Sequence, residues 1–339
     1  MSHHFNASGS RRRAAAWLAA SCASALALGL IGPYAHAQGA PDYPNRPVRI
    51  IVPQSPGAGT DVTTRWIAER LAQDWKVQVI VDNKPGAGVT IGTDAAAKAA
   101  PDGYTLFMGG SAVYLTKLLS KSVPFDAVKD FRVLMGINDA LLALVVPANL
   151  PVNTVGELVA YAKARPGKLS FGSAGGGSVT YIAPALMAKM AGLDVVSVPY
   201  KGSGPLVTDT ISGQIQFSVP AIATAAPHVA SGRLKALAVT GARRSKAMPQ
   251  VPTMAESGFD GFEVTSKTYL AAPAGLPDAI AEKIVAAVGR IIATPDYQRF
   301  LDSQGLEAEA VAPRAYAASV QEELRRWQKV VDTIGLKPE

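Results

Sequence analysis

Short β-branched and apolar runs alternate with amphipathic helical patterns along this chain, and few folds are compatible with that alternation. The first three β-rich runs are Val48–Val52, Val77–Val81 and Tyr104–Met108. Residues 61–74, between the first two runs, place their apolar side chains on one helical face, and residues 88–103 predict a second short helix. This β-α-β-α-β order predicts a parallel sheet with right-handed crossovers.

A second series of the same kind begins near Thr154. Its pattern predicts helices at 154–165, 178–191 and 203–212, and strands at 169–172, 195–198, 215–219 and 234–239. A return rich in proline and glycine then leads to a strand at 268–275 and to helices at 277–293, 295–304 and 313–333. The chain is therefore expected to be α/β, with two similar lobes facing one another.

The N-terminus has the pattern of a secretory signal peptide. Arg11, Arg12 and Arg13 precede the apolar run Ala14–Ile31, and small residues flank His36 in Ala-His-Ala at 35–37. Residues 1–37 are therefore predicted to be removed, which places the mature protein in the periplasm. An uncleaved membrane anchor is the alternative, and it is disfavoured because the run is mostly alanine and ends in a cleavage site.

Charge and residue inventory exclude several classes of function. The formal charge is +7, and removal of residues 1–37, which carry three arginines and no acid, leaves +4. The mature chain has no long basic run, so nucleic acid is not indicated as a partner. It keeps no cysteine and one histidine, His228, which excludes Cys–His nucleophiles and His- or Cys-built zinc sites. A surface or capping role is favoured for His228.

A glycine-rich turn between the first strand and the first helix is the first candidate binding element. In SPGAGTD, at 55–61, Gly57 and Gly59 precede a helix whose expected N-cap is Thr60 or Asp61. Free backbone N–H groups and the helix dipole make such a turn an anion site. The residues fit neither a P-loop, which needs Lys-Ser/Thr, nor a dinucleotide fingerprint, which needs glycine where Val62 stands. A carboxylate is therefore the expected anion.

Two further turns have the same character. NKPGAGVTIG, at 83–92, precedes the second helix, and SAGGGSVTY, at 173–181, precedes a helix of the second lobe. Each turn alone is equally well explained as an ordinary strand–helix connection. Together, at the carboxyl ends of strands in both lobes, they predict a cleft for a small molecule with a carboxylate at one or both ends.

At this point the mature chain resembles a family, the Bug-type periplasmic receptors of tripartite tricarboxylate transporters. The resemblance rests on the order and spacing of YPNRPVRIIVPQSPGAGTDVTTR, VDNKPGAGVTIGTDAAAKAAPDGYTL, VPFDAVKDF, YAKARPGKLSFGSAGGGS, VPYKGSGPLVTDTISGQI, PHVASGRLKALAVTGARRS, VPTMAESGF and APAGLP. It implies a two-lobed Venus-flytrap fold with a mixed sheet in each lobe. Lobe 1 would comprise residues 38–143 and 265–339 and lobe 2 residues 144–264, with crossing strands near 140–146 and 263–268.

The same resemblance implies a function without chemistry. Such a receptor is a monomer that needs no cofactor or metal, holds a small organic carboxylate between its lobes and delivers it to membrane permease subunits. By position, the ligand-binding residues would be Gln54, Ser55, Gly57, Ala58, Thr60, Asp61, Gly86, Ala87, Gly88, Val89, Ser111 and Ala112 in lobe 1, and Ala174, Gly175, Gly176, Ser178, Tyr181, Pro220 and Ala221 in lobe 2.

Two charged candidates have competing explanations. Asp61 is better explained as a helix cap than as a ligand contact, because a carboxylate facing a carboxylate ligand costs energy. Lys267, near the crossing strand, is equally consistent with pairing to a second ligand carboxylate and with a solvated surface lysine.

Departures from the family pattern suggest the kind of ligand. Gln54 and Ser55 make the floor of the expected ligand pocket in lobe 1 more polar. Ala58 and Val89 stand where glycine is common in the family. In lobe 2, Tyr181 and the pair Pro220-Ala221 leave fewer hydrogen-bonding groups, which suggests a less polar ligand end.

Two other functions stay open at this stage: a ligand sensor for a signalling partner, and a secreted α/β hydrolase. The hydrolase is disfavoured because Ser173 and Ser178 do not form a nucleophile elbow and no acid–histidine pair is evident.

Overall fold

The structure is a computed structural model that describes residues 43–173, 177–200, 202–309 and 313–338. Residues from Pro44 onward form one compact unit, and within it the strands make two separate sheets. The predicted signal peptide lies outside the described residues.

The first sheet has the strand order β11-β4-β10-β3-β1-β2. Its members are β1 (Val48–Val52), β2 (Val79–Asn83), β3 (Thr105–Gly110), β4 (Phe131–Ala140), β10 (Ser266–Pro273) and β11 (Glu307–Ala308). β2, β1 and β3 are parallel, as predicted, whereas β10 is antiparallel to both β3 and β4. The sheet is therefore mixed.

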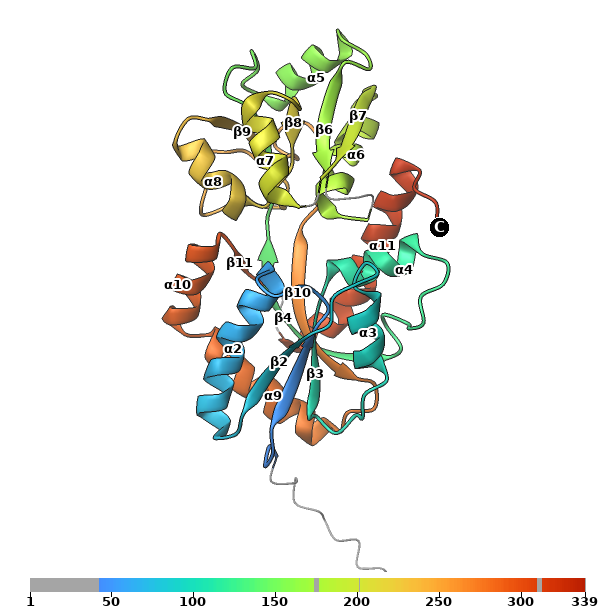
Figure 1. Cartoon of the computed structure of the whole chain (residues 1–339), viewed down its shortest axis with the longest axis vertical. Coiled ribbons are helices and arrows are strands. Elements are labelled where there is room, and N and C mark those ends of the chain that lie inside the picture. The colour runs from blue at the N-terminus through green and yellow to red at the C-terminus, as the bar shows by residue number, and fades with distance from the viewer. Residues whose placement is uncertain (1–42, 174–176, 201, 310–312, 339) are drawn as a thin grey trace, which may run out of the picture. The chain divides into compact units, whose positions relative to one another are not determined.

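Helices cover both faces of this sheet (Figure 1). One group, α2 (Gly59–Trp75), α9 (Asp278–Ile292) and α10 (Pro295–Gln304), packs together, and the other comprises α3 (Thr90–Ala97), α4 (Ser111–Leu119) and α11 (Pro313–Ile334). α11 buries an apolar stripe that includes Tyr316, Val320 and Trp327. Burial of each such side chain contributes roughly 1.5–3 kcal/mol, which fixes the helix on the sheet.

The second sheet has the order β7-β6-β8-β5-β9. Its strands are β5 (Ala143–Pro147), β6 (Leu169–Ser173), β7 (Val195–Pro199), β8 (Phe217–Ser218) and β9 (Leu234–Val239), and its helices are α5 (Val155–Lys163), α6 (Val179–Ala191), α7 (Ser203–Ser212) and α8 (Ile222–Ala230). β7, β6 and β8 are parallel, and β5 is antiparallel to β8 and β9.

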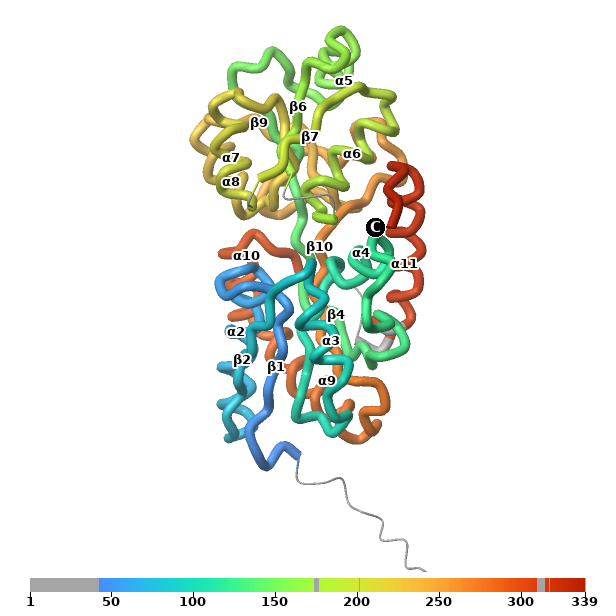
Figure 2. Tube along the Cα trace, turned by 45° about the vertical axis from the view of Figure 1, so that its right-hand side comes forward, coloured from blue at the N-terminus to red at the C-terminus, as the bar shows by residue number. Residues whose placement is uncertain are grey.

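The chain crosses between the sheets twice, and the two crossings lie side by side. It leaves the first sheet between β4 and β5 and returns between β9 and β10. The amide of Thr240 donates to Leu142 O at 3.0 Å, and the amide of Val264 donates to Thr240 O at 3.1 Å, so the segments are hydrogen-bonded to each other. α11 also contacts α6 of the second sheet and runs beside α4 (Figure 2).

Candidate ligand-binding site

Three turns lie at one edge of the first sheet, where the carboxyl ends of β1, β2 and β3 meet. β1 is in parallel register with β2 from Val48–Val79 to Val52–Asn83, and it is also parallel to β3. Adjacent parallel strands end at the same edge, so the turns that follow them are neighbours. Ligands of open α/β sheets bind at this edge.

The first turn ends in a helix start with free amides. α2 begins at Gly59, its N-cap is Ala58 in extended conformation, and no side chain caps it. The prediction that Thr60 or Asp61 is the N-cap is wrong, because both lie inside the helix. The amides of Gly59, Thr60 and Asp61 have no hydrogen-bond acceptor within the described residues. With the helix dipole, these N–H groups offer a site for an anion.

The Asp61 carboxylate binds the protein itself. Its Oδ2 accepts hydrogen bonds from the Gly57 amide at 2.8 Å and from Arg65 Nε at 3.0 Å, and its Oδ1 accepts from Asn83 Nδ2 at 2.9 Å. Burial alone would raise the pKa of Asp61, but the bonds from Arg65, Gly57 and Asn83 outweigh it and hold that pKa below its usual value. Asp61 therefore shapes the turn while remaining ionised.

The second turn is built from residues with positive φ. Gly86, Ala87, Gly88 and Val89 have φ values of 126°, 45°, 60° and 74°. A β-branched residue such as Val89 is a clear outlier in this region. Such strain is maintained only by the surrounding structure and is frequent at ligand-binding loops.

The first two turns are in close contact. A Cβ on Gly92 of α3 would lie 2.7 Å from both Pro53 Cα and Lys84 O, so only glycine fits there. The Asn83 side chain also donates to Gln54 O at 3.0 Å. From α4, Thr116 Oγ1 donates to Gly88 O at 2.5 Å. These contacts tie turn one, turn two and α4 into one rigid edge.

The third element is the start of α4, where Ser111 is buried. Ser111 Oγ donates to Glu323 Oε1 of α11 at 3.0 Å and accepts from the Lys267 amide at 3.0 Å. Ser111 thus connects the predicted site to the crossing strand β10. The neighbouring Ala112 is half-buried.

The described members of the predicted lobe 2 set belong to the second sheet and its helices. Gly177 lies beside Leu119 of α4, and the Tyr181 ring packs 5.9 Å from that of Phe171. Pro220 O accepts from the Ala143 amide at 3.0 Å, and Ala221 is the N-cap of α8. Ser178 Oγ is 2.9 Å from Thr180 Oγ1. Ala174, Gly175 and Gly176 lie outside the described residues.

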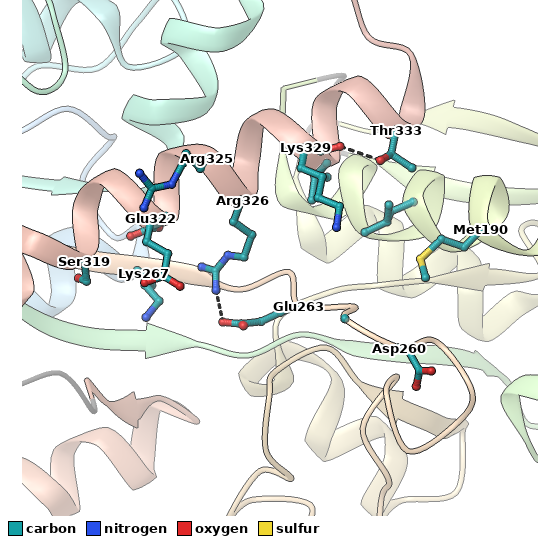
Figure 3. A pocket seen from close by; sticks show the side chains of 14 residues that line it. Met190, Asp260, Glu263, Lys267, Ser319, Glu322, Arg325, Arg326, Lys329 and Thr333 are labelled. Atoms are coloured by element: carbon teal, nitrogen blue, oxygen red, sulfur yellow. Dashed lines mark hydrogen bonds and ion pairs between the residues drawn. The ribbon is translucent and has the colours of Figure 1, made fainter.

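Lys267 is half-buried and paired within the protein. Its Nζ lies 3.2 Å from Glu309 Oε2, and only 16% of its side chain is exposed. It lines two cavities of about 730 and 460 Å³, both of which Glu263 also lines. Figure 3 shows the larger one, between α11 and the crossing segment, where Arg326 pairs with Glu263. Neither cavity is lined by a residue of the glycine turns.

Sequence reasoning missed two features of this region. Gly59, Ile91 and Gly92 supply backbone amides at the helix starts, and the amides of Ile91 and Gly92 also have no acceptor among the described residues. An N-cap predicted two or three residues earlier, at Ala58, would have identified Gly59 as the first residue of the helix. The buried Glu323 beside Ser111 has no such signal, because it comes from a helix more than 200 residues away.

Features of other functional classes do not converge in the described part of the chain. His228 lies in α8, where its Nδ1 is 2.6 Å from an Arg233 nitrogen. Among these residues, no group of three or more His, Cys, Asp or Glu side chains is arranged to hold a metal ion. The described helices include none with the length and apolar character to cross a membrane.

Two α/β sheets joined by paired crossings, with free amides at the neighbouring starts of α2 and α3, are the architecture of a two-lobed periplasmic binding protein. Solved structures agree: a Rhodopseudomonas palustris protein determined with adipate has a TM-score of 0.77 and 31% identity, covering 88% of this chain and 100% of its own. MatC from the same species, with bound malate, has a TM-score of 0.73 and 31% identity, covering 85% of this chain and 100% of its own.

Sequence comparison specifies the family. The model of the tripartite tricarboxylate transporter family receptor matches residues 63–336. BugT of Bordetella pertussis is 34% identical over 297 residues, which are 87% of this chain and 91% of BugT. The chain belongs to the tripartite tricarboxylate transporter receptor family. It is therefore a periplasmic solute-binding receptor and not an enzyme, and the predicted fold and family are confirmed.

Proposed function

We propose that this receptor captures a small organic mono- or dicarboxylate between its lobes and delivers it to a membrane permease. The observation that carries the proposal is the set of unpaired amides at the starts of α2 and α3, on neighbouring turns of one sheet edge. Family membership supports transport, and the adipate and malate in the two related structures support a carboxylate ligand.

Backbone groups of lobe 1 hold one carboxylate in this proposal. The ligand-binding groups are those of Gln54, Ser55, Gly57, Ala58, Thr60, Gly86, Ala87, Gly88 and Val89, with Ser111 and Ala112 at the third turn. Asp61 acts by shaping the first turn, because both of its carboxylate oxygens are already hydrogen-bonded. Exposure of Gly57, Gly59, Gly86 and Gly88 leaves these turns accessible to a ligand.

The other end of the ligand faces lobe 2. Tyr181, Pro220 and Ala221 offer it mainly apolar surface, and Ser178 belongs to the same predicted set. A linear chain of methylene groups, with its second carboxylate near the lobe boundary, fits this asymmetry. Lys267 is a weaker candidate for that carboxylate, because Glu309 already pairs with it.

Export and lobe division complete the proposal. The first 37 residues are the signal peptide, and the lobes divide between Ala143 and Leu144 and between Val264 and Thr265. The second division lies in the segment between β9 and β10, and the first lies within β5, one residue beyond the segment between β4 and β5. A signalling partner remains the second candidate output, but membership of a transporter receptor family favours the permease.

A thermal-shift screen tests the ligand class. Adipate, malate, other linear dicarboxylates, aromatic carboxylates, nicotinate and acidic amino acids are added to the mature protein at about 1 mM. A ligand present at 100 times its Kd stabilises the folded state by about 2.7 kcal/mol, which is a shift of a few degrees in Tm. The matched amides of the acids serve as controls. The proposal fails if none of the acids raises Tm more than its amide does.

A further inference from the structure

Two buried carboxylates are bonded to elements that carry candidate ligand groups. Measured over the whole residue, Asp61 and Glu323 are the most deeply buried charged residues that the structure describes, at 1% and 6% exposure. Asp61 accepts a hydrogen bond from the Gly57 amide of the first turn. Burial of a charge is costly unless the charge is hydrogen-bonded. The hydrogen-bond partners of Glu323 therefore indicate what this residue does.

Glu323 is hydrogen-bonded to the start of α4. Its Oε1 accepts from Ser111 Oγ at 3.0 Å and from Trp327 Nε1 at 3.3 Å. Trp327 lies one helical turn further along α11 and is 1% exposed, so its ring is fixed in the core. α11 runs beside α4 (Figure 2). The first residue of α4 is thus attached to the C-terminal helix through a buried side-chain hydrogen bond.

The backbone of Lys267 in β10 holds the same helix start. The Lys267 amide donates to Ser111 Oγ at 3.0 Å. Its carbonyl oxygen would lie 2.7 Å from a Cβ on Gly110, the N-cap of α4, so a larger residue at this position would force the two backbones apart. The start of α4 is therefore fixed relative to both β10 and α11.

α4 begins with unpaired amides, as α2 and α3 do. No side chain caps the helix, and the amides of Ser111, Ala112 and Val113 have no acceptor among the described residues. α4 follows β3, which is parallel to β1, so the helix starts at the same sheet edge as the first two turns. The position of α4 therefore decides where these donors point.

The Ser111 hydroxyl has no proton left for a ligand carboxylate. A serine hydroxyl carries one proton, and that of Ser111 is donated to Glu323. One of its two lone pairs accepts from the Lys267 amide. The remaining lone pair can only accept, and an ionised carboxylate has no proton to give. A direct hydrogen bond from this hydroxyl to the ligand carboxylate is therefore excluded while Glu323 holds the proton.

We propose that Glu323 is a positioning residue for ligand capture. Through the Ser111 hydroxyl it fixes the start of α4, whose free amides complete the carboxylate site. This inference rests on the proposed function. Ser111 is then also a positioning residue through its side chain, and Asp61 does the same for the first turn. Lobe 1 thus places its backbone donors with buried carboxylates that do not themselves contact the ligand.

Two substitutions of Glu323 test whether its acceptor oxygen is what matters. Glu323→Gln keeps an Oε1 for Ser111 Oγ and Trp327 Nε1, whereas Glu323→Met has a similar length and no such acceptor. Glu322→Met, at an exposed neighbour on the same helix, is the matched control. Glu323→Gln and Glu322→Met should bind within about twofold of wild type, and Glu323→Met should bind roughly five- to twentyfold more weakly.

Calorimetry measures these affinities on the folded mature protein. The probe is adipate, malate or whichever acid of the thermal-shift screen raises Tm most, and the temperature is one at which every variant is fully folded. A merely structural role of Glu323 would lower the Tm of Glu323→Met and leave its affinity unchanged. An equal loss of affinity in Glu323→Gln and Glu323→Met would assign the effect to charge and overturn the acceptor role.

A double-mutant cycle distinguishes positioning from direct contact. Ser111→Ala breaks the bonds to both Glu323 and the Lys267 amide, so it should weaken binding at least as much as Glu323→Met does. The variant with both substitutions should bind within about twofold of Ser111→Ala, because the bond to Glu323 is already lost. If the hydroxyl contacted the ligand independently of Glu323, the two losses would multiply.

Hydrogen exchange tests the anchor without any ligand. The amides of residues 115–119 are bonded within α4, and those of α9 in the same sheet layer serve as an internal reference. Relative to α9, the α4 amides should exchange roughly fivefold faster in Ser111→Ala and Glu323→Met than in wild type and Glu322→Met. Ser111→Ala alone decides this point where Glu323→Met does not fold.

The outcomes separate this inference from the proposed function. Equal affinities of Glu323→Met and Glu322→Met, multiplied losses in the cycle, or unchanged exchange in α4 each overturn the positioning role and leave the carboxylate function intact. If no acid binds the wild-type receptor, the proposed function is contradicted and positioning for capture falls with it, even where exchange shows that Glu323 anchors α4.

Discussion

At the scale of single residues, the candidate site depends on backbone conformation more than on side-chain chemistry. The unusual residue is Val89, whose φ of 74° is imposed on a β-branched side chain. The sequence identifies Val89 as a replacement for a common glycine, but its strain is visible only in the structure. Asp61 is similar: the sequence suggests a helix cap, which the structure contradicts, and its bonds to Gly57 and Asn83 are visible only in the structure.

Substitution of Val89 by glycine should stabilise the protein. Relief of a strained positive φ is worth about 1–3 kcal/mol, and the greater freedom of glycine in the unfolded chain offsets about 0.5–1 kcal/mol of it. We therefore expect a net gain of about 1 kcal/mol in the free energy of unfolding, measured with urea at pH 7. Val89→Ala, which keeps a side chain at the same φ, should gain less. A Val89→Gly protein less stable than wild type would contradict the strain.

At the scale of elements, the alternating pattern predicts most strands and helices but misses α4, β4 and β11. β4 is buried along most of its length and ends in polar Asn138 and Asp139, so it lacks the alternation of a half-exposed strand. β11 has only two residues, too few for any periodic signal. β2 lies two residues later than expected. α2 begins earlier than expected, at Gly59, because the prediction assumed a side-chain N-cap and the observed N-cap is Ala58.

The packing of α3 against the first turn gives a prediction with an internal control. Gly92→Ala should displace Pro53 or Lys84, because the added Cβ would lie 2.7 Å from backbone atoms of both. We expect a lower Tm and a loss of carboxylate affinity. Gly289→Ala in α9 adds a Cβ with no neighbour within 4 Å and should instead stabilise by about 0.5–1 kcal/mol. Equal effects of the two substitutions on Tm would contradict the tight contact between turns.

At the scale of the whole molecule, the sequence predicts the two-lobed fold through its resemblance to the family. It does not predict which polar side chains meet near the crossings, because these side chains come from segments far apart in the chain. Asp139, Lys267 and Glu323 come from β4, β10 and α11, and only the folded sheet brings them behind Ser111. Capture of a ligand requires that the closed arrangement of the lobes bind it better than the open one. Backbone amides on one rigid edge supply such a preference when the second lobe covers the ligand.

One pair of variants tests the central claim that unpaired backbone amides bind the carboxylate. Gly59 is the first residue of α2, the preceding Ala58 is extended, and a Cβ at Gly59 would have no neighbour within 4 Å. Gly59→Pro therefore removes one free N–H at a position where proline suits a helix, and Gly59→Ala keeps that N–H.

The measurement is the affinity of both variants for the acid identified by the thermal-shift screen. A hydrogen bond to a charged group is worth about 1.5–3 kcal/mol, so Gly59→Pro should bind roughly 10- to 100-fold more weakly than Gly59→Ala, with no loss of Tm in the absence of ligand. Equal affinities of the proline and alanine variants would contradict the account.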